Sequence, residues 1–569
     1  MSNPSAFFRT RLLSLLFVCV GVVLVGRLYM LQVVEADSFL QKADHQYAPQ
    51  GGALWDRGAI LFTNKDGSEV GAASLQNGFA LALIPKLITD PEALADQLST
   101  LISFDRAAFL LKASKKNDPY EEIANQIPES VGTQIAQEKL TGVVLERERW
   151  RFYPGAALGA HALGFVGFDG NLRAGRAGLE RYYDDVLTRS STGTFHNFFA
   201  EIFSDVSSIV TSKNREGTVI TAIEPTVEQY LQDRVEGTRE AYDAIRVGGI
   251  IMDPVTGRIA ALALSPSFDP NHYAQEPDQS VFQNSLVQNV YEMGSIVKPL
   301  TMAAGIDAGV VTATTTYMDY GSLTLNGKTI GNYDGKGRGQ VSMQEVLNQS
   351  LNTGAAFVAL RLGADQFIEY VKRYGLGEET GIDLPSEASG LIKNLESKRE
   401  IEIATASYGQ GIALTPIQTV RALAALGNGG YLITPHLATK INYTIGPSRT
   451  VDGGEKIQVL KAETSAEITR MLVEVVDKAL LGGEYKMDHY SIAAKTGTGL
   501  IANPAGGGYF SDKFLHSFFG YFPAYHPRFI VFLYIVEPKG VAFASHTLTK
   551  PFMDITKFLI NYYEIPPDR

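Results

Sequence analysis

The chain has 569 residues, which is too long for a single hydrophobic core, so two or more domains are expected. Its net charge of −11 argues against nucleic-acid binding, which needs a basic face, while its 45% hydrophobic and 20% charged residues are ordinary for globular protein. Its one cysteine, Cys19, excludes an intramolecular disulfide, and its nine scattered histidines show no metal-ligand spacing, so we expect no metal and no cofactor.

The N-terminal segment has the composition of a membrane-targeting sequence. Residues 12–26 are apolar apart from one serine and two glycines, and they follow Arg9 and Arg11. Fifteen residues is short for a membrane span and typical of a signal-peptide core. Residues 34–36, Val-Glu-Ala, could serve as a poor cleavage site, so a cleaved signal peptide is one reading.

An uncleaved anchor is the reading we favour. The apolar pattern resumes after Arg27, and a helix over residues 7–34 would be long enough to cross a bilayer with some tilt. We therefore expect a transmembrane anchor at 9–34. Arginines beside a span stay inside the cell, which makes residues 1–8 a cytoplasmic tail and the rest of the chain extracytoplasmic.

Residues 35–215 are expected to form a separate domain of mixed α/β structure with much loop. Helices are predicted at 91–101, with Asp90 as the N-cap and proline in the first turn, and at 128–139. No catalytic constellation is visible in this region. A change in composition near residues 214–217 marks the start of a second domain, 216–569.

The second domain is predicted to hold an antiparallel sheet flanked by helices, an α+β architecture. Strands are expected at 218–223, 249–252, 258–264, 492–498, 517–522 and 530–536, and helices at 226–239 and 550–562.

Ser295 and Lys298 form the chain's single Ser-x-x-Lys pair. Three residues apart on a helix, the two side chains lie on one face about 5–6 Å apart at Cβ. Pro299 belongs in a first turn, because it has no N–H to donate, which places Ser295 at the helix N-terminus. An amine held in a dry pocket beside a serine can lose its proton and activate that serine as a nucleophile.

A lone Ser-x-x-Lys pair is expected by chance about once or twice in a chain of this length, so its meaning depends on two later motifs. Ser350-Leu-Asn352 follows, and then Lys495-Thr-Gly-Thr498. A second Ser-x-Asn at Ser212 precedes the nucleophile in a polar stretch and is interpreted as a loop. The ordered triple resembles the signature of penicillin-binding proteins and serine β-lactamases.

Further segments resemble class B penicillin-binding proteins, the monofunctional peptidoglycan D,D-transpeptidases. These segments are Arg151-Phe-Tyr-Pro154, Gly178-Leu-Glu180, Asp253-Pro-Val-Thr-Gly-Arg-Ile-Ala-Ala261, Pro266-Ser-Phe-Asp-Pro-Asn271, Tyr408-Gly-Gln-Gly411, Thr415-Pro416, Gly427-Asn-Gly-Gly430 and His516-Ser-Phe-Phe-Gly520. Met293 and Gly499-Leu500 depart from the usual family pattern beside the site without removing a catalytic group. The resemblance covers most of residues 145–540. It implies a penicillin-binding-protein/serine β-lactamase-like transpeptidase domain at 216–569, preceded by an elongated non-catalytic pedestal domain at 35–215.

The resemblance also implies a role for each motif residue. Ser295 is the acylated nucleophile, Lys298 the general base, Ser350 the relay of a proton to the leaving amine, and Asn352 a ligand of the acyl donor's amide. The edge strand would carry Lys495, Thr496, Gly497 and Thr498 against the substrate, with Gly497 leaving room for the substrate backbone. The oxyanion hole would be formed by the backbone N–H groups of Ser295 and Thr498. Asp334 is assigned only a Tyr-Asp-Gly turn.

The implied function is cross-linking of peptidoglycan stem peptides through a Ser295 acyl-enzyme, with release of the terminal D-Ala from D-Ala-D-Ala and covalent inhibition by β-lactams. Such an enzyme would sit in a bacterial cell membrane as a single-pass protein, working with a membrane glycosyltransferase and with elongation or division proteins. Two alternatives stay open: a β-lactamase or β-lactam sensor of the same superfamily, and a non-catalytic scaffold that activates a glycosyltransferase.

Overall fold

The computed structural model describes residues 54–170, 172–189, 216–503 and 507–569. The anchor expected at 9–34, the tail at 1–8 and the second Ser-x-Asn motif at Ser212 lie outside these residues. Within the described ranges, no helix has both the length and the apolar character needed to cross a membrane.

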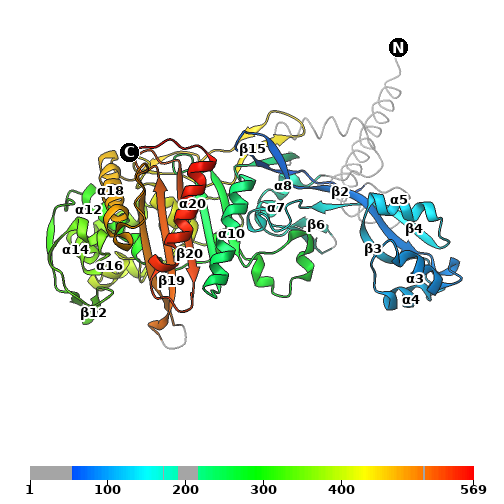
Figure 1. Ribbon diagram of the computed structural model, residues 1–569, viewed down its shortest axis with the longest axis horizontal. Coiled ribbons are helices and arrows are strands. Elements are labelled where there is room, and N and C mark those ends of the chain that lie inside the picture. The colour runs from blue at the N-terminus through cyan, green and yellow to red at the C-terminus, as the bar shows by residue number, and fades with distance from the viewer. Residues whose placement is uncertain (1–53, 171, 190–215, 504–506) are drawn as a thin grey trace, which may run out of the picture. The chain divides into compact units, whose positions relative to one another are not determined.

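The C-terminal part is organised around a five-stranded antiparallel sheet (Figure 1). Its strands in spatial order are β18 (Ala493–Ala502), β19 (Tyr509–Phe522), β20 (Phe529–Val536), β8 (Arg246–Met252) and β9 (Ile259–Ser265). All four pairings are antiparallel, as expected. β18, which carries the Lys-Thr-Gly motif, is an edge strand, so one side of its backbone is open to a further strand.

Both faces of this sheet are covered, which explains why its central strand is apolar throughout. In β20, Ile530, Phe532 and Tyr534 pack into one core, and Val531 and Leu533 pack into another. Successive side chains of a strand point to opposite faces, so every side chain of a strand covered on both faces is buried and is expected to be apolar. Helices α10 (Pro225–Ala241) and α20 (Thr549–Tyr562) cover one face together.

A helical region packs on the other face and contains the first two motifs. Its helices are α11 (Ser285–Gln288), α12 (Lys298–Asp307), α13 (Met343–Asn348), α14 (Asn352–Leu362), α15 (Ala364–Arg373), α16 (Glu400–Ala406), α17 (Pro416–Ala424) and α18 (Ala462–Glu474). A short helix, α19 (Ala544–Thr547), precedes α20.

A seven-stranded sheet joins the N-terminal and C-terminal parts of the described chain. Its strands are β16 (Arg449–Thr450), β15 (Ala438–Tyr443), β7 (Gly217–Thr221), β1 (Ile60–Thr63), β2 (Glu69–Leu83) and β3 (Glu121–Pro128) in that order, with β4 (Val143–Phe152) also paired to β2. The strand predicted at 218–223 is therefore β7, which pairs with β1 on one side and β15 on the other. Strand pairing makes these segments one continuous structure.

The predicted helices of the N-terminal part are present. α3 (Pro91–Ser99) is capped by Asp90, whose carboxylate accepts hydrogen bonds from the backbone N–H groups of Glu92 and Ala93. α5 (Glu129–Glu138) begins one residue later than predicted, directly after Pro128. The remaining helices are α4 (Arg106–Ala113), α6 (Ala160–Leu163), α7 (Gly178–Tyr182) and α8 (Asp184–Leu187).

Small two-stranded sheets complete the fold. They pair β5 (Val166–Asp169) with β6 (Leu172–Gly175), β10 (Thr316–Asp319) with β13 (Gly339–Ser342), β11 (Ser322–Leu325) with β12 (Lys328–Gly331), and β14 (Tyr431–Leu432) with β17 (Ile457–Gln458). The second and third of these pairs lie next to the start of α14, where the Ser-x-Asn motif ends.

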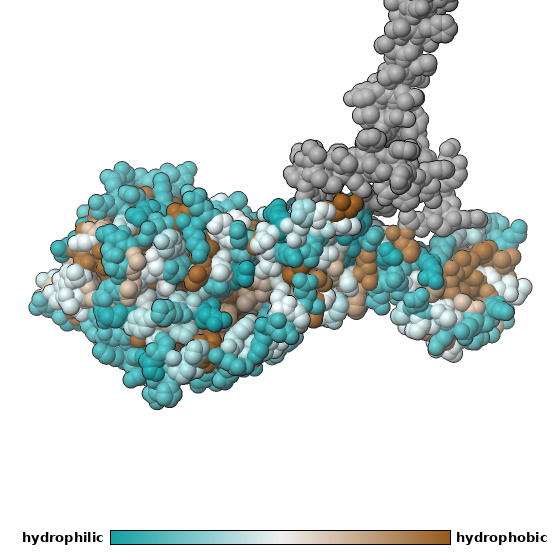
Figure 2. Space-filling model, turned by 90° about the horizontal axis from the view of Figure 1, so that it is seen from above, coloured by the Kyte–Doolittle hydropathy of each residue, from teal (hydrophilic) through white to brown (hydrophobic). Residues whose placement is uncertain are grey.

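The surface is unevenly apolar. Figure 2 shows that apolar residues on the visible face gather over the region of β2–β4 and α3–α5, whereas the surface around the five-stranded sheet is mainly hydrophilic. Leu87 and Leu111 of this first region are 49% and 68% exposed. Apolar surface that gathers in one place is typical of a contact site rather than of random exposure.

Candidate active site

Ser295 lies on a tight turn that passes directly against the edge strand. A 3-10 turn, Gly294–Val297, leads into α12, and Pro299 occupies the first turn of that helix, as predicted. Gly294 has φ of +64°, and a Cβ placed there would lie 2.6 Å from the Thr498 carbonyl oxygen. Only glycine allows both the backbone conformation and this close approach.

Lys298 is buried beside Ser295 and is surrounded by oxygen atoms. Its Nζ lies 2.9 Å from Ser295 Oγ, 2.5 Å from the Ser350 carbonyl oxygen and 3.2 Å from Ser350 Oγ. The residue is only 1% exposed. Burial, reinforced by the positive charge of Lys495, lowers the pKa of Lys298 well below its ordinary value of 10.5. A lysine in this state is able to accept a proton from the serine hydroxyl.

Lys495, on the edge strand β18, contacts the hydroxyl of Ser350 from another side. Its Nζ lies 3.1 Å from Ser350 Oγ and 3.1 Å from the Thr496 carbonyl oxygen. Burial lowers the pKa of Lys495 to about 8. The Ser350 hydroxyl therefore bridges two amines, and the structure brings Ser295, Lys298, Ser350 and Lys495 into one hydrogen-bonded chain.

Ser350 has an unusual backbone conformation for a serine. Its φ is +56°, in the left-handed region, and α14 starts two residues later at Asn352. Asn352 donates a hydrogen bond from Nδ2 to the Gly331 carbonyl oxygen at 2.8 Å, so it is held by the end of β12 rather than by the lysines. A non-glycine residue in this region costs energy and persists only where its surroundings fix it.

A cleft of about 960 Å³ opens over these side chains. Ser295, Ser350, Asn352, Lys495, Thr496 and Thr498 all line it. Thr496 and Thr498 alternate along β18 and so face the same side, while Thr498 Oγ1 also accepts a hydrogen bond from the Ala544 N–H at 3.2 Å. The cleft is large enough for a small peptide segment.

Gly497 does not face this cleft, which corrects the expected reason for a glycine there. A Cβ at residue 497 would clash with Ser517 Oγ and would lie 2.6 Å from the Met293 carbonyl oxygen. Ser517 is the cross-strand neighbour of Gly497, and its hydroxyl donates to Met293. The glycine therefore makes room for the turn that carries Ser295, not for a substrate backbone.

Several cleft residues were not identified from the sequence. Glu292 accepts a hydrogen bond from the Tyr509 hydroxyl at 2.9 Å, and burial raises the pKa of this carboxyl group. Tyr333 and Phe543 meet edge to face, with ring centroids 5.8 Å apart. Tyr333 and Phe543 line the cleft from loops, and Tyr509 lines it from the start of β19, while Glu292 lies behind Tyr509. None of the four belongs to a sequence motif, so only the fold brings them to the site. In the described part of the chain, no group of three or more His, Cys, Asp or Glu residues is placed to hold a metal ion.

Two family descriptions match the chain. Residues 247–557, more than half of it, match the penicillin binding protein transpeptidase domain, and residues 55–195 match the penicillin-binding protein dimerisation domain. The chain therefore belongs to the penicillin-binding proteins, and its combination of these two domains is that of class B. The expected penicillin-binding transpeptidase is confirmed.

Named relatives cover nearly the whole chain. It is 29% identical over 577 residues to Stage V sporulation protein D of Bacillus subtilis, covering 97% of this chain and 85% of the relative. It is 26% identical to the peptidoglycan D,D-transpeptidase FtsI of Escherichia coli, covering 96% of this chain and 90% of the relative.

Solved structures show the same fold. Penicillin-binding protein 3 of Mycobacterium tuberculosis, complexed with aztreonam, is similar with a TM-score of 0.69 and 22% identity, covering 91% of this chain and 98% of that chain. Penicillin-binding protein 2X of Streptococcus thermophilus is similar with a TM-score of 0.72 and 19% identity, covering 90% of this chain and 81% of that chain.

Proposed function

We propose that this protein is a serine-type D,D-transpeptidase that cross-links peptidoglycan stem peptides through an acyl-enzyme on Ser295. The observation that carries this proposal is the contact between Lys298 Nζ and Ser295 Oγ at 2.9 Å, in a place where burial lowers the pKa of the lysine. Membership of the penicillin-binding protein family supports the reaction class.

Acylation begins with Ser295 Oγ attacking the carbonyl carbon of the penultimate D-Ala. The hydroxyl proton passes to neutral Lys298, and a C–O bond forms as the carbonyl oxygen gains negative charge. The C–N bond to the terminal D-Ala then breaks, and the departing nitrogen takes a proton from the Ser350 hydroxyl. Ser350 is supported in this role by its position between Lys298 and Lys495: protonated Lys298 restores the Ser350 proton and becomes neutral again, while Lys495 keeps its charge.

The backbone N–H groups of Ser295 and Thr498 are proposed to stabilise the developing oxyanion. The close approach of Gly294 to Thr498 supports this pairing, because it brings the nucleophile turn against the edge strand. Donors fixed in this way need no reorganisation as the charge develops.

Substrate is proposed to lie along β18 as an added strand. Thr496, Thr498 and charged Lys495 would hold the terminal carboxylate, and Asn352 would bind the donor amide. Gly497 would take part through its backbone alone, since its missing side chain faces the turn. All four side chains named here line the cleft.

The acyl group is then transferred to an amine of a neighbouring stem peptide. The amine nitrogen attacks the ester carbon and forms a C–N bond, and its surplus proton passes to neutral Lys298. The C–O bond to Ser295 then breaks, and Lys298 returns the proton to Ser295 Oγ. A β-lactam would acylate Ser295 by the same first step. The nitrogen released when the ring opens stays attached to the acyl group, so the acyl-enzyme would persist because this nitrogen blocks the place of the acceptor amine.

We also propose the arrangement of the whole chain: a cytoplasmic tail at 1–8, a membrane anchor at 9–34, a pedestal at 35–215 and the transpeptidase domain at 216–569. The enzyme would work outside the cell membrane, where its substrate lies. The apolar surface over β2–β4 and α3–α5 is a suitable contact for a membrane glycosyltransferase or a division protein (Figure 2).

The reaction can be tested with a stem pentapeptide ending in D-Ala-D-Ala and an amine acceptor. We expect release of D-Ala together with an aminolysis product, and neither from a Ser295→Ala control. A β-lactamase would instead release penicilloyl product rapidly after treatment with penicillin. A non-catalytic scaffold would form no acyl-enzyme at all.

A further inference from the structure

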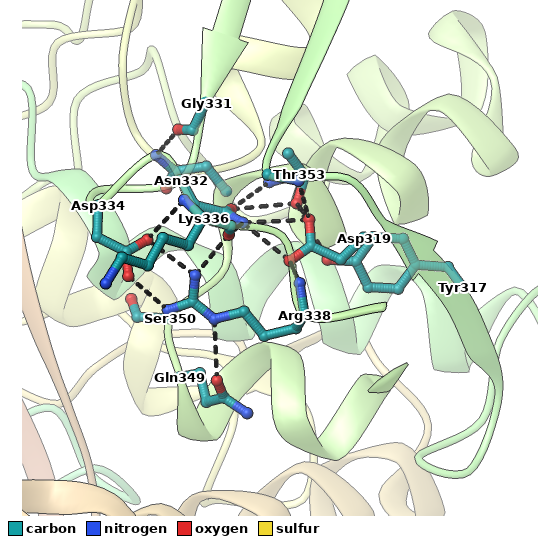
Figure 3. Close-up of polar contacts among 12 residues, drawn as sticks. Tyr317, Asp319, Gly331, Asn332, Asp334, Lys336, Arg338, Gln349, Ser350 and Thr353 are labelled. Atoms are coloured by element: carbon teal, nitrogen blue, oxygen red, sulfur yellow. Dashed lines mark hydrogen bonds and ion pairs between the residues drawn. The ribbon is translucent and has the colours of Figure 1, made fainter. Parts of the chain in front are cut away.

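A buried carboxylate outside the three motifs binds the segments on either side of Ser350 and Asn352. Asp319, at the end of β10, is 2% exposed. Figure 3 shows its carboxylate beside Thr353 and Asn332. It accepts hydrogen bonds from Thr353 Oγ1 at 2.8 Å, Asn332 Nδ2 at 3.0 Å, the Arg338 N–H at 3.0 Å and the Gly321 N–H at 2.9 Å.

The first connection from Asp319 runs to the start of α14. Thr353 follows Asn352 directly, and its N–H and hydroxyl also lie 3.3 and 3.1 Å from Asn332 Oδ1. The residue before Asn332, Gly331, accepts the hydrogen bond from Asn352. Asp319 therefore holds together the two segments that fix the orientation of the Asn352 side chain.

The second connection reaches the residue before Ser350. The Arg338 backbone N–H is bonded to Asp319, and the Arg338 guanidinium donates to Gln349 Oε1 at 3.2 Å (Figure 3). Asp334 holds the same guanidinium at 2.8 Å. Ser350, whose φ of +56° requires support, is thus held at Gln349 on one side and at Thr353 on the other.

We propose that Asp319 is a positioning residue for the transpeptidase reaction: through Thr353 and Arg338 it keeps Ser350 and Asn352 in the geometry in which Ser350 reaches both lysines. This inference rests on the role proposed for Ser350. Asp319 does not line the cleft, so it acts through its partners and not on the substrate.

Because of the hydrogen bonds that Asp319 accepts, the substitution Asp319→Asn is a specific test of the positioning role. Every group around the carboxylate is a donor, and the two backbone N–H groups, of Gly321 and Arg338, face different oxygens. The amide of Asp319→Asn must turn its NH₂ toward one of them and leave that N–H without an acceptor. Asp383→Asn is a matched control, since Asp383 is also buried and accepts from Tyr183, Leu437 and Ala438, away from the cleft.

The experiment measures the limiting rate of acylation by a fluorescent penicillin, its dissociation constant and the fraction of molecules labelled at completion. We expect Asp319→Asn and Thr353→Val to lower the limiting rate per active molecule by about tenfold or more, because small misplacements of reacting groups have effects of this size. Thr353→Ser keeps the hydroxyl and should stay within about twofold of the wild type. Asp383→Asn should lower thermal stability and leave the limiting rate unchanged.

A wild-type limiting rate in both Asp319→Asn and Thr353→Val would overturn the positioning role. If Asp319→Asn does not fold, the comparison of Thr353→Val with Thr353→Ser decides the question alone, and equal rates would overturn it. A loss confined to the labelled fraction would mean that Asp319 only stabilises the fold. Acylation of the wild-type protein, measured alongside, tests the proposed function separately.

Discussion

Lys298 and Lys495 lie on different elements, α12 and β18, yet their Nζ atoms contact the same atom, Ser350 Oγ, at 3.2 and 3.1 Å. Two buried positive charges around one hydroxyl repel each other, so one lysine is driven to lose its proton. The pKa of Lys298 is lowered both by burial and by Lys495, whereas that of Lys495 is lowered by burial to about 8. The surroundings of the two lysines thus distinguish Lys298, the base, from Lys495, which binds the substrate carboxylate.

This difference predicts a bell-shaped pH dependence of acylation. The second-order rate constant should rise with pH as Lys298 loses its proton, and fall above about pH 8 as Lys495 becomes neutral and no longer attracts the substrate carboxylate. Lys495→Arg keeps its charge at high pH and should lose the descending limb, whatever its maximal rate. A descending limb that is unchanged in this variant would contradict the role of Lys495.

The base is tested by replacing Lys298 with a residue that keeps the charge. Arginine does not deprotonate near neutral pH, so Lys298→Arg should lose about hundredfold or more in acylation rate, nearly as much as Lys298→Ala. Stopped-flow measurement with a chromogenic β-lactam gives both rates. An arginine variant close to the wild-type rate would leave Lys298 only an electrostatic role.

Ser350→Ala removes the hydroxyl that both lysines share. Lys298 keeps its contacts with Ser295 Oγ and the Ser350 carbonyl, so the fold should be preserved. We expect the acylation rate to fall by about hundredfold, the usual size of a lost proton-transfer group. Near-normal acylation would show that the leaving nitrogen takes its proton from another group.

Gly497→Val should destabilise the protein, because the new side chain would enter the space of Ser517 and Met293 behind the strand. Overpacking of this kind costs about 1–3 kcal/mol, and the displaced turn should also slow acylation. Gly71→Val is the control, since Gly71 also lies on a strand but a Cβ added there would meet no atom within 4 Å. Thermal unfolding of both variants measures the difference, and only Gly497→Val should unfold at a clearly lower temperature than the wild type. An unchanged melting temperature for Gly497→Val would contradict the packing described here.

The elements that carry the motifs were predicted well because their signals are local. The prediction for Ser295 and Lys298 depends on helical spacing and on Pro299. The prediction for the strand at 492–498 depends on its alternating pattern and on its place in the chain. The left-handed conformation of Ser350 was not predicted, because nothing in the residue type requires it.

Contacts between residues far apart in the chain could not be predicted from the sequence, for a physical reason. The direction in which Gly497 faces depends on strand pairing with Ser517 and on the path of the turn at Met293. Asp319 is 34 residues from Thr353, and its neighbours in sequence are those of an ordinary strand end. Such contacts depend on how the core packs, and no short sequence motif indicates them.

The most direct test of the account is mass spectrometry of the protein after treatment with penicillin. We predict one penicilloyl group per chain, located on the peptide that contains Ser295, and no adduct on Ser295→Ala. The fold of this variant should survive, because the Ser295 hydroxyl caps neither the turn nor α12. An adduct on any other residue, or one that persists in Ser295→Ala, would contradict the assignment of the nucleophile and with it the proposed mechanism.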